Sequence, residues 1–85
     1  MAYIYILKSL KYPKLYVGST IDLERRIIQH NSGFSRYTKI YMPWKIIYTE
    51  EFINIQDARK REKYLKSCAG RKFIKKNIYS GVAQR

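Results

Sequence analysis

Two residues with catalytic potential stand one helical turn apart in the segment 22–31. Arg26 and His30 are four positions apart, so in a helix a cation and a titratable imidazole lie side by side. At 100° per residue, His30 returns to the stripe that Leu23 and Ile27 share, which faces the core. The pair therefore sits at the edge of a buried stripe. A solvated arginine beside a half-buried structural histidine has the same spacing, so both interpretations stay open.

A carboxylate inside the apolar stripe of a later helix is the second such feature. The apolar residues of that helix share roughly 80° of arc on a helical projection: Ile55, Ala58, Leu65 and Ala69. Glu62 lies within this arc, where a carboxylate is costly unless a cation or a metal accompanies it. Neighbouring basic residues such as Lys66 point elsewhere on the projection. We therefore expect either a salt bridge to another element, for which Arg26 is eligible, or a functional carboxylate.

Two tyrosines on predicted strands complete a set that suits phosphodiester hydrolysis: Tyr5, Tyr16, Arg26, His30 and Glu62. One carboxylate, with waters and a phosphate oxygen, is sufficient to hold Mg²⁺. A guanidinium can bind the phosphate with two hydrogen bonds, and a tyrosine of lowered pKa can relay a proton from water. No Walker, CxxC or Ser/His/Asp pattern competes. This interpretation requires the five side chains to meet around one pocket that holds a cation and a phosphate.

Three strands and three helices would have to position these side chains. β-Branched and aromatic residues predict strands at 3–7, 15–17 and 44–52. Apolar periodicity and capping residues predict helices over 22–31, over about 54–67 and over 71–79. The first strand is apolar on both faces, so we expect it at the centre of the sheet. The order β-β-α-β-α-α predicts an α+β fold with a three-stranded, mainly antiparallel sheet flanked by helices.

Small and polar residues mark the ends of these elements. Three residues can cap the first helix: Ser19, Thr20 and Asp22. Gly33 is placed to end that helix in a left-handed conformation, and Gly70 is predicted to separate the last two helices. Cys68, the single cysteine, fits as a small apolar filler. We expect one domain over residues 1–85, with a frayed end at 80–85.

Residues 32–43 lack a clean period, and we predict a loop there. Its cations alternate with aromatic side chains, which suits phosphate contact and stacking on bases or sugars. The residues expected to contact nucleic acid are Arg36, Tyr37 and Lys39 in this loop, Arg25 on the preceding helix, and Lys11 and Lys14 between the first two strands. A loop anchored to the core by its aromatic rings is an equally good interpretation.

The charge balance narrows the classes of partner. Eighteen Lys and Arg residues against six Asp and Glu give a formal net charge of +12, which a polyanion relieves. Nucleic acid fits best, whereas no segment has the broad apolar face of a membrane-surface helix. With one cysteine, no signal segment and no long apolar run, we expect a cytoplasmic protein that has neither an internal disulfide nor a cysteine-rich zinc site.

Four motifs follow one another along the chain: Tyr3-Ile4-Tyr5, Tyr16-Val17-Gly18, Arg26-Ile27-Ile28-Gln29-His30-Asn31 and, downstream, Glu62. In this order they resemble the GIY-YIG endonuclease domain, and most of all its small standalone bacterial members. Any one tripeptide is a weak signal, but the ordered set is specific. The resemblance covers residues 3–78 and implies a three-stranded antiparallel sheet with flanking helices, which agrees with the fold predicted from the pattern.

The resemblance implies hydrolysis of DNA phosphodiester bonds with one divalent metal, Mg²⁺ or Mn²⁺, and a role in DNA repair. By this analogy Glu62 would be the metal ligand. Tyr16 would be the general base that activates water, with His30 as its hydrogen-bonding assistant or as an alternative base. Arg26 would bind the scissile phosphate, and Tyr5 would orient the phosphate or the nucleophile.

Two departures qualify that analogy, and Gly18 supports it by letting the backbone approach closely at the strand end. Tyr3 stands where the motif has glycine, which affects packing more than chemistry. Ser19 stands where some relatives have a lysine near the phosphate. Two lysines could substitute for it: Lys11 and Lys14. Asn77 is a candidate match for a late asparagine seen in some members.

Two other functions use the same features. A module of this fold could hold nucleic acid without cleaving it, and RNA is not excluded as its ligand. A scaffold in a ribonucleoprotein would use the charge structurally and would prefer RNA over DNA. The sequence also leaves the oligomeric state open, because nicking one strand needs one site whereas cutting both strands needs two.

Overall fold

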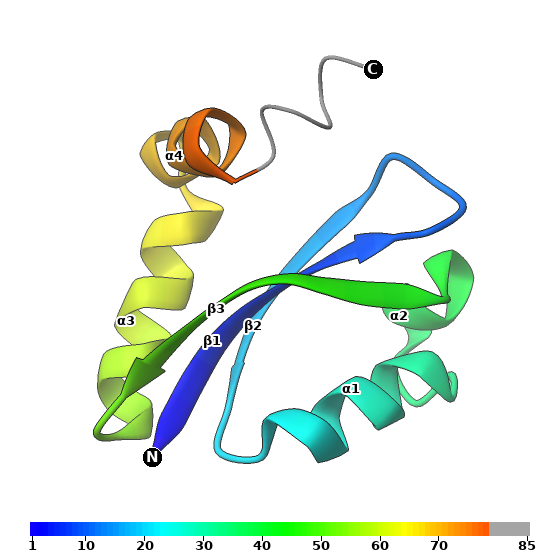
Figure 1. Ribbon diagram of the computed structural model, residues 1–85, viewed down its shortest axis with the longest axis horizontal. Helices are drawn as coiled ribbons and strands as arrows, with labels where there is room; N and C mark the ends of the chain where they lie inside the picture. Colours follow the sequence, from blue (N-terminus) through cyan, green and yellow to red (C-terminus); the bar gives the residue numbers. More distant parts are fainter. Residues whose placement is uncertain (79–85) are drawn as a thin grey trace.

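The computed structural model describes residues 1–78 as a three-stranded antiparallel sheet with helices on both sides (Figure 1). The elements in chain order are β1 (Ala2–Ser9), β2 (Leu15–Thr20), α1 (Leu23–Asn31), α2 (Arg36–Tyr41), β3 (Trp44–Phe52), α3 (Ile55–Lys66) and α4 (Cys68–Asn77). The strand order is β2-β1-β3, and both outer strands run antiparallel to β1. The predicted α+β class and three-stranded sheet are confirmed. Residues 80–85, for which we predicted a frayed end, lie outside the described residues.

β1 is the central strand, and its side chains alternate between two hydrophobic cores. Ile4 and Ile6, both fully buried, belong to the core that α3 and α4 cover. Tyr5 and Leu7 belong to the core on the opposite face, which α1 and α2 cover. Figure 1 shows α3 and α4 along one side of the sheet and α1 and α2 along the other. The central position predicted from the two apolar faces of this segment is confirmed.

β2 lies at an edge of the sheet, and its side chains alternate in the same way. Tyr16 packs against the core under α1, whereas Val17 belongs to the core under α3. The register pairs Gly18 of β2 with Tyr5 of β1. Because no further strand covers the outer side of β2 in the described sheet, residues from both faces can reach the same edge.

α1 begins and ends at residues that the sequence had marked. The Asp22 carboxylate accepts a hydrogen bond of 3.1 Å from the Arg25 backbone N–H, so Asp22 is the cap among the three candidates. Gly33 follows the helix with φ +79°, the left-handed conformation predicted for it.

Within residues 1–78, no helix has the length and apolar character needed to cross a membrane.

The segment 32–43 contains the helix α2, so our prediction of a loop throughout is wrong. Tertiary contacts supply the reason. Tyr37 and Tyr41 stand four apart with ring centroids 5.1 Å from each other, and Thr38 is fully buried. The Thr38 carbonyl accepts a 2.8 Å hydrogen bond from the Trp44 indole. A six-residue helix has little intrinsic stability, so these contacts decide its conformation.

The boundary between α3 and α4 lies at Ser67, and our prediction of a break at Gly70 is wrong. Ser67 Oγ accepts a hydrogen bond of 3.2 Å from the Gly70 backbone N–H and so caps α4. Gly70 is buried inside α4, where a Cβ atom would lie 2.1 Å from the Tyr64 carbonyl oxygen and 2.4 Å from Leu65 Cα. Its missing side chain lets α4 pack directly on α3. Cys68, expected as an apolar filler, is instead exposed.

We predict that Gly70→Ala lowers the free energy of unfolding by about 2 kcal/mol, because the added methyl group overlaps the α3 backbone. The loss should appear although alanine favours helix by about 1 kcal/mol over glycine. Urea unfolding followed by circular dichroism measures it. Ala69→Met, which enlarges the exposed neighbouring residue, is the control and should change stability by less than about 0.5 kcal/mol. A Gly70→Ala variant as stable as the parent would contradict the close packing of α4 on α3.

Candidate active site

The Tyr5 hydroxyl is the centre of a buried hydrogen-bond cluster between β1 and α1. It lies 2.9 Å from His30 Nε2, and Arg26 Nε donates to it across 3.4 Å. Tyr5 and His30 are each 1 % exposed. The spacing predicted for Arg26 and His30 thus places both side chains on the same hydroxyl group.

Burial controls the protonation of this cluster. Desolvation, with the Arg26 charge as a second cause, lowers the pKa of His30 to about 4. The buried His30 Nδ1 has no hydrogen-bond partner within residues 1–78, so no acceptor stabilises a second proton there. Desolvation also raises the pKa of Tyr5 to about 12, against the opposing hydrogen bond from Arg26. At neutral pH the imidazole is therefore neutral and the Tyr5 phenol is protonated.

Gly18 makes room for the Tyr5 phenol on the opposite strand. A Cβ atom at this position would lie 2.4 Å from the Tyr5 hydroxyl oxygen and 3.1 Å from a ring carbon of Tyr16. Real Cβ atoms do not approach that closely, so only glycine leaves the ring where it is. The close approach that we expected at Gly18 is therefore between the β2 backbone and the ring of Tyr5, which pairs with Gly18 across the two strands.

Tyr16 is the more accessible of the two strand tyrosines. Its ring lies 4.8 Å from the His30 ring and 6.3 Å from the Tyr5 ring, measured between centroids, and it is half-buried. On its other side it faces Tyr37 at 6.0 Å. A phenol at this position can meet water, which the fully buried Tyr5 cannot.

Glu62 lies on α3 and contacts β2 at the free edge of the sheet. Ser19 Oγ donates to Glu62 Oε1 across 2.5 Å, and Lys66 Nζ donates to Oε2 across 2.6 Å. Lys66 Nζ also lies 5.9 Å from the centroid of the Tyr16 ring. Our expectation that Lys66 points away from Glu62 is therefore wrong. Arg26, the partner we considered, instead donates to Tyr5 and to Gln29 Oε1.

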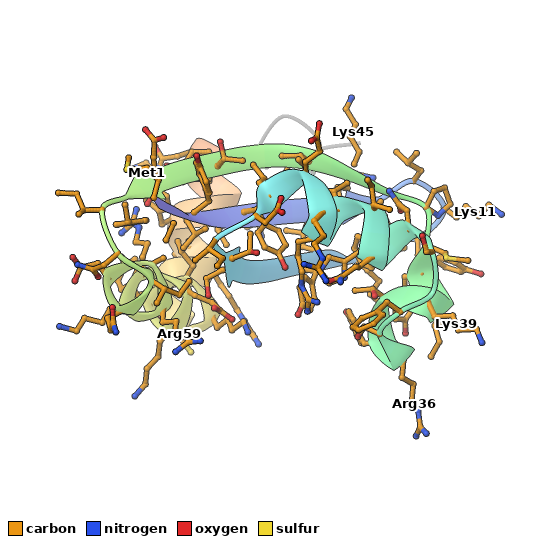
Figure 2. The ribbon with its side chains drawn as sticks, turned by 90° about the horizontal axis from the view of Figure 1, so that it is seen from below. Met1, Lys11, Arg36, Lys39, Lys45 and Arg59 are labelled. Atoms are coloured by element: carbon orange, nitrogen blue, oxygen red, sulfur yellow. The ribbon has the colours of Figure 1, made fainter. Side chains whose placement is uncertain are left out.

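Three adjoining hollows lie near β2: two include residues of this strand, and the one between them is lined by α3 alone. One of about 460 Å³ adjoins the end of the strand and is lined by cationic side chains: Arg25, Arg26 and Arg59. A second of about 310 Å³ shares Arg59 with it and contains Glu62 and Lys66. A third of about 430 Å³ shares Lys66 with the second. Figure 2 shows Arg36 and Arg59 projecting beyond the β2 side of the sheet and Lys45 projecting from the β3 side.

The other residues expected to contact nucleic acid are spread over the molecule. Arg25 lines the first hollow and Tyr37 the third, whereas Arg36 and Lys39 are exposed on α2. Lys14 Nζ lies over the Tyr41 ring at 5.4 Å from its centroid. Figure 2 places Lys11 at the opposite end of the molecule from Arg59, so Lys11 is not brought to the hollows. Asn77 donates to the Phe73 carbonyl within α4.

Sequence reasoning missed two cations at the site. Arg59 lines two of the hollows, and Lys66 binds the carboxylate itself. The spacing of Glu62 and Lys66, four residues apart on one helix, is a signal that would have found the second of them.

A hard divalent cation fits the donor set at Glu62. Within residues 1–78 no group of three or more His, Cys, Asp and Glu side chains converges, so an ion could not be enclosed by such ligands alone. Mg²⁺ commonly uses one or two carboxylates and takes its other ligands from water and phosphate oxygens. The Lys66 ammonium group binds Glu62 Oε2, so this carboxylate oxygen already has a positively charged partner.

Comparisons with known proteins point to one family. Residues 1–77 match the model of the GIY-YIG catalytic domain. A UPF0213 protein of Staphylococcus saprophyticus is 43% identical over 74 residues, which are 86% of this chain and 89% of the relative. One of Clostridium perfringens is 46% identical over 67 residues, or 78% and 71% of the two chains. The solution NMR structure of a UPF0213 protein from Bacillus halodurans is similar at a TM-score of 0.50 and 34% identity, over 85% of this chain and 78% of that one.

We predict that an NMR titration of His30, the one histidine in the sequence, gives a pKa of about 4. The unfolded chain takes up this proton near pH 6.5. Between pH 6.5 and 4 the unfolded state therefore binds more protons than the folded state, and the free energy of unfolding falls as the pH is lowered. Urea unfolding across this range should show a loss approaching about 3 kcal/mol.

His30→Gln is the control for this titration and should remove the loss of stability above pH 4.5. Glu50 acts in a lower range. Its burial alone would raise its pKa, but Arg61 and Tyr48 outweigh burial and lower it, so its contribution is lost only below the ordinary value of 4.5. An imidazole pKa near 6.5 together with a flat stability profile would contradict the buried, neutral state of His30.

We predict that Gly18→Ala moves the Tyr5 ring away from β2, because the new methyl group would overlap the phenol. The variant should lose about 1–3 kcal/mol of stability. It should also shift the imidazole NMR signals of His30, since the Tyr5 hydroxyl would leave Nε2. Thr20→Ala, two residues along the same strand, is the control for which these signals should stay in place. Unchanged signals in Gly18→Ala would contradict the role of glycine in seating Tyr5.

Proposed function

This chain belongs to the GIY-YIG catalytic domain family, and on that basis we propose that it is an endonuclease that hydrolyses DNA phosphodiester bonds. The observation that best supports the proposal is that four residues of the predicted set lie together. Arg26 and His30 both contact the Tyr5 hydroxyl, and the Tyr16 ring lies 4.8 Å from the His30 ring. The fifth, Glu62, accepts a hydrogen bond from Ser19 on the strand that carries Tyr16. The net charge of +12 supports a polyanionic substrate.

In this proposal Glu62 holds one divalent cation, Mg²⁺ or Mn²⁺. When bound, the cation supplies Lewis-acid stabilisation of the charge that develops on the phosphoryl oxygens. The hydrogen bond from Ser19 to Oε1 fixes the orientation of the carboxylate. Lys66 donates to the other oxygen, so a cation held there would take the place of its ammonium group.

Tyr16 is our choice for the group that removes the proton from the attacking water. It is the accessible phenol of the pair, whereas Tyr5 is buried and its pKa is raised to about 12, which makes it a poor base. His30 is also buried and binds the Tyr5 hydroxyl, so we assign it the role of assistant and not of alternative base. The chain of contacts runs from His30 through Tyr5 to Arg26.

Arg26 is our choice for binding the scissile phosphate. Its Nε donates to Tyr5 and its Nη1 donates to Gln29, so two hydrogen bonds hold the guanidinium in place. The hydrogen bond with Tyr5 raises the pKa of Arg26, which keeps it charged throughout the physiological range. A fixed cation that faces the reacting phosphate stabilises the transition state without reorganisation.

A second candidate function, nucleic-acid binding without cleavage, draws support from one observation. Both carboxylate oxygens of Glu62 already have partners, Ser19 and Lys66. If Lys66 stays bound to Glu62 and no divalent cation takes its place, the protein would still carry the cations near β2. It would then bind DNA with an affinity that falls steeply as the salt concentration rises.

Nicking of supercoiled plasmid in Mg²⁺ or Mn²⁺ tests the proposal. We predict that Glu62→Ala, Arg26→Ala and Tyr16→Phe each lower the nicking rate by at least about a hundredfold, because each removes a group that holds the cation, binds the phosphate or activates the water. Tyr5→Phe should lose less, since it removes an orienting hydroxyl and leaves the ring in place.

Glu51→Ala is the matched control for Glu62→Ala, because it removes an exposed carboxylate from β3 and should leave the rate unchanged. Equal nicking by parent, Glu62→Ala and Arg26→Ala would refute the nuclease proposal. Salt-dependent DNA binding by a parent that nicks in neither metal would establish the second candidate instead.

A further inference from the structure

The third hollow at the β2 edge, which we call the stacking cleft, combines Tyr16 of the predicted set with residues that are not part of that set. Tyr16 and Tyr37 line it together with Lys66 and Arg71, over apolar side chains that include Leu65 and Ile74. Four elements contribute, namely β2, α2, α3 and α4. Its volume of about 430 Å³ falls in the range of about 300–1,000 Å³ that is typical of pockets for small ligands.

Tyr37 is held in place although it is 41% exposed. Its ring stacks on the Trp44 ring at 6.3 Å with an angle of 28° between the planes, and it contacts Tyr41 at 5.1 Å. Tyr16 stands 6.0 Å away at an angle of 33°. An exposed ring fixed by other rings offers a stacking surface at little cost in conformational entropy, and such surfaces are typical of sites that bind unpaired bases.

The cations of the stacking cleft connect it to the proposed catalytic centre. Lys66 contributes to its lining and also binds Glu62 Oε2 at 2.6 Å. Arg71 lies farther along the same cleft, on α4. A peptide that only needed an apolar pocket would not use these two charges, whereas a phosphate-linked ligand would.

We propose that the stacking cleft binds one base that has left the helical stack, from the nucleotide next to the phosphate held at Arg26. The base stacks on Tyr37, and its flanking phosphate pairs with Arg71. Because it names a subsite for the same DNA strand, this inference rests on the proposed function. The three arginines at the other end of β2 would then hold the backbone on the opposite side of Glu62.

A double-mutant cycle between Tyr37 and the bases of a DNA probe tests this subsite. The probe is a fluorescent hairpin with a short single-stranded arm, in which each arm base in turn is replaced by an abasic residue. Binding is measured by anisotropy in EDTA, so that affinity is read without cleavage. One abasic position should weaken binding to the parent about tenfold, and the same change should have little effect on binding to Tyr37→Ala.

Four variants control the cycle. Tyr37→Phe keeps the ring and should behave as the parent. Tyr37→Leu keeps apolar bulk without an aromatic face, so it should lose the coupling even if Tyr37→Ala fails to fold. Arg71→Gln should weaken binding and reduce the salt slope by about one, whereas Lys45→Gln, at the β3 side of the sheet, should retain the full abasic effect.

The cycle separates the two proposals. If every abasic position lowers the affinity of the parent and of Tyr37→Ala by the same factor, the stacking cleft is not a base site, whether or not the protein nicks DNA. If the coupling is found in a protein that nicks nothing, the subsite stands and the nuclease proposal fails.

Discussion

The buried hydrogen bond between the Tyr5 hydroxyl and His30 sets the geometry of this protein. A phenol and an imidazole withdrawn from water are costly unless they satisfy each other, so α1 must lie where His30 meets the central strand. Gly18 allows this by leaving space for the ring on β2. Once α1 is seated, Arg26 lies one turn earlier on the same side and reaches the same hydroxyl. The position of the guanidinium is thus a consequence of how the core is closed.

The edge position of β2 brings together groups that belong to opposite faces of the sheet. Tyr5 and Tyr16 lie on the face covered by α1, whereas Glu62 comes from α3 on the other face. These groups could not approach each other across a central strand. Because β2 has no outer neighbour in the described sheet, Ser19 can bind the carboxylate and Lys66 can lie over the Tyr16 ring. Glu62 is therefore linked to Tyr16 around the edge of the sheet, through Lys66, and not within one layer.

Patterns that extend over several residues were predictable from the sequence, whereas features decided by single contacts were not. The apolar faces of residues 3–7 predicted the central strand, and the spacing of Arg26 and His30 predicted that their side chains lie side by side. α2 is too short to have a clear period, and its packing decides its conformation. A helical projection also failed for Lys66, because a flexible four-carbon side chain can turn back one helical turn to reach Glu62.

Five of the six acidic residues form ion pairs or lie at the starts of helices. Glu50 pairs with Arg61, and Glu62 pairs with Lys66. Three further acids lie at the starts of helices, where they stabilise the exposed N–H groups: Asp22, Glu24 and Asp57. Asp22 even borders the hollow that contains three arginines, yet its carboxylate accepts the backbone N–H of α1. Within residues 1–78 neither ion pair involves Arg25, Arg26 or Arg59, so these three like charges repel one another at their hollow with Asp22 as the one acid that lines it.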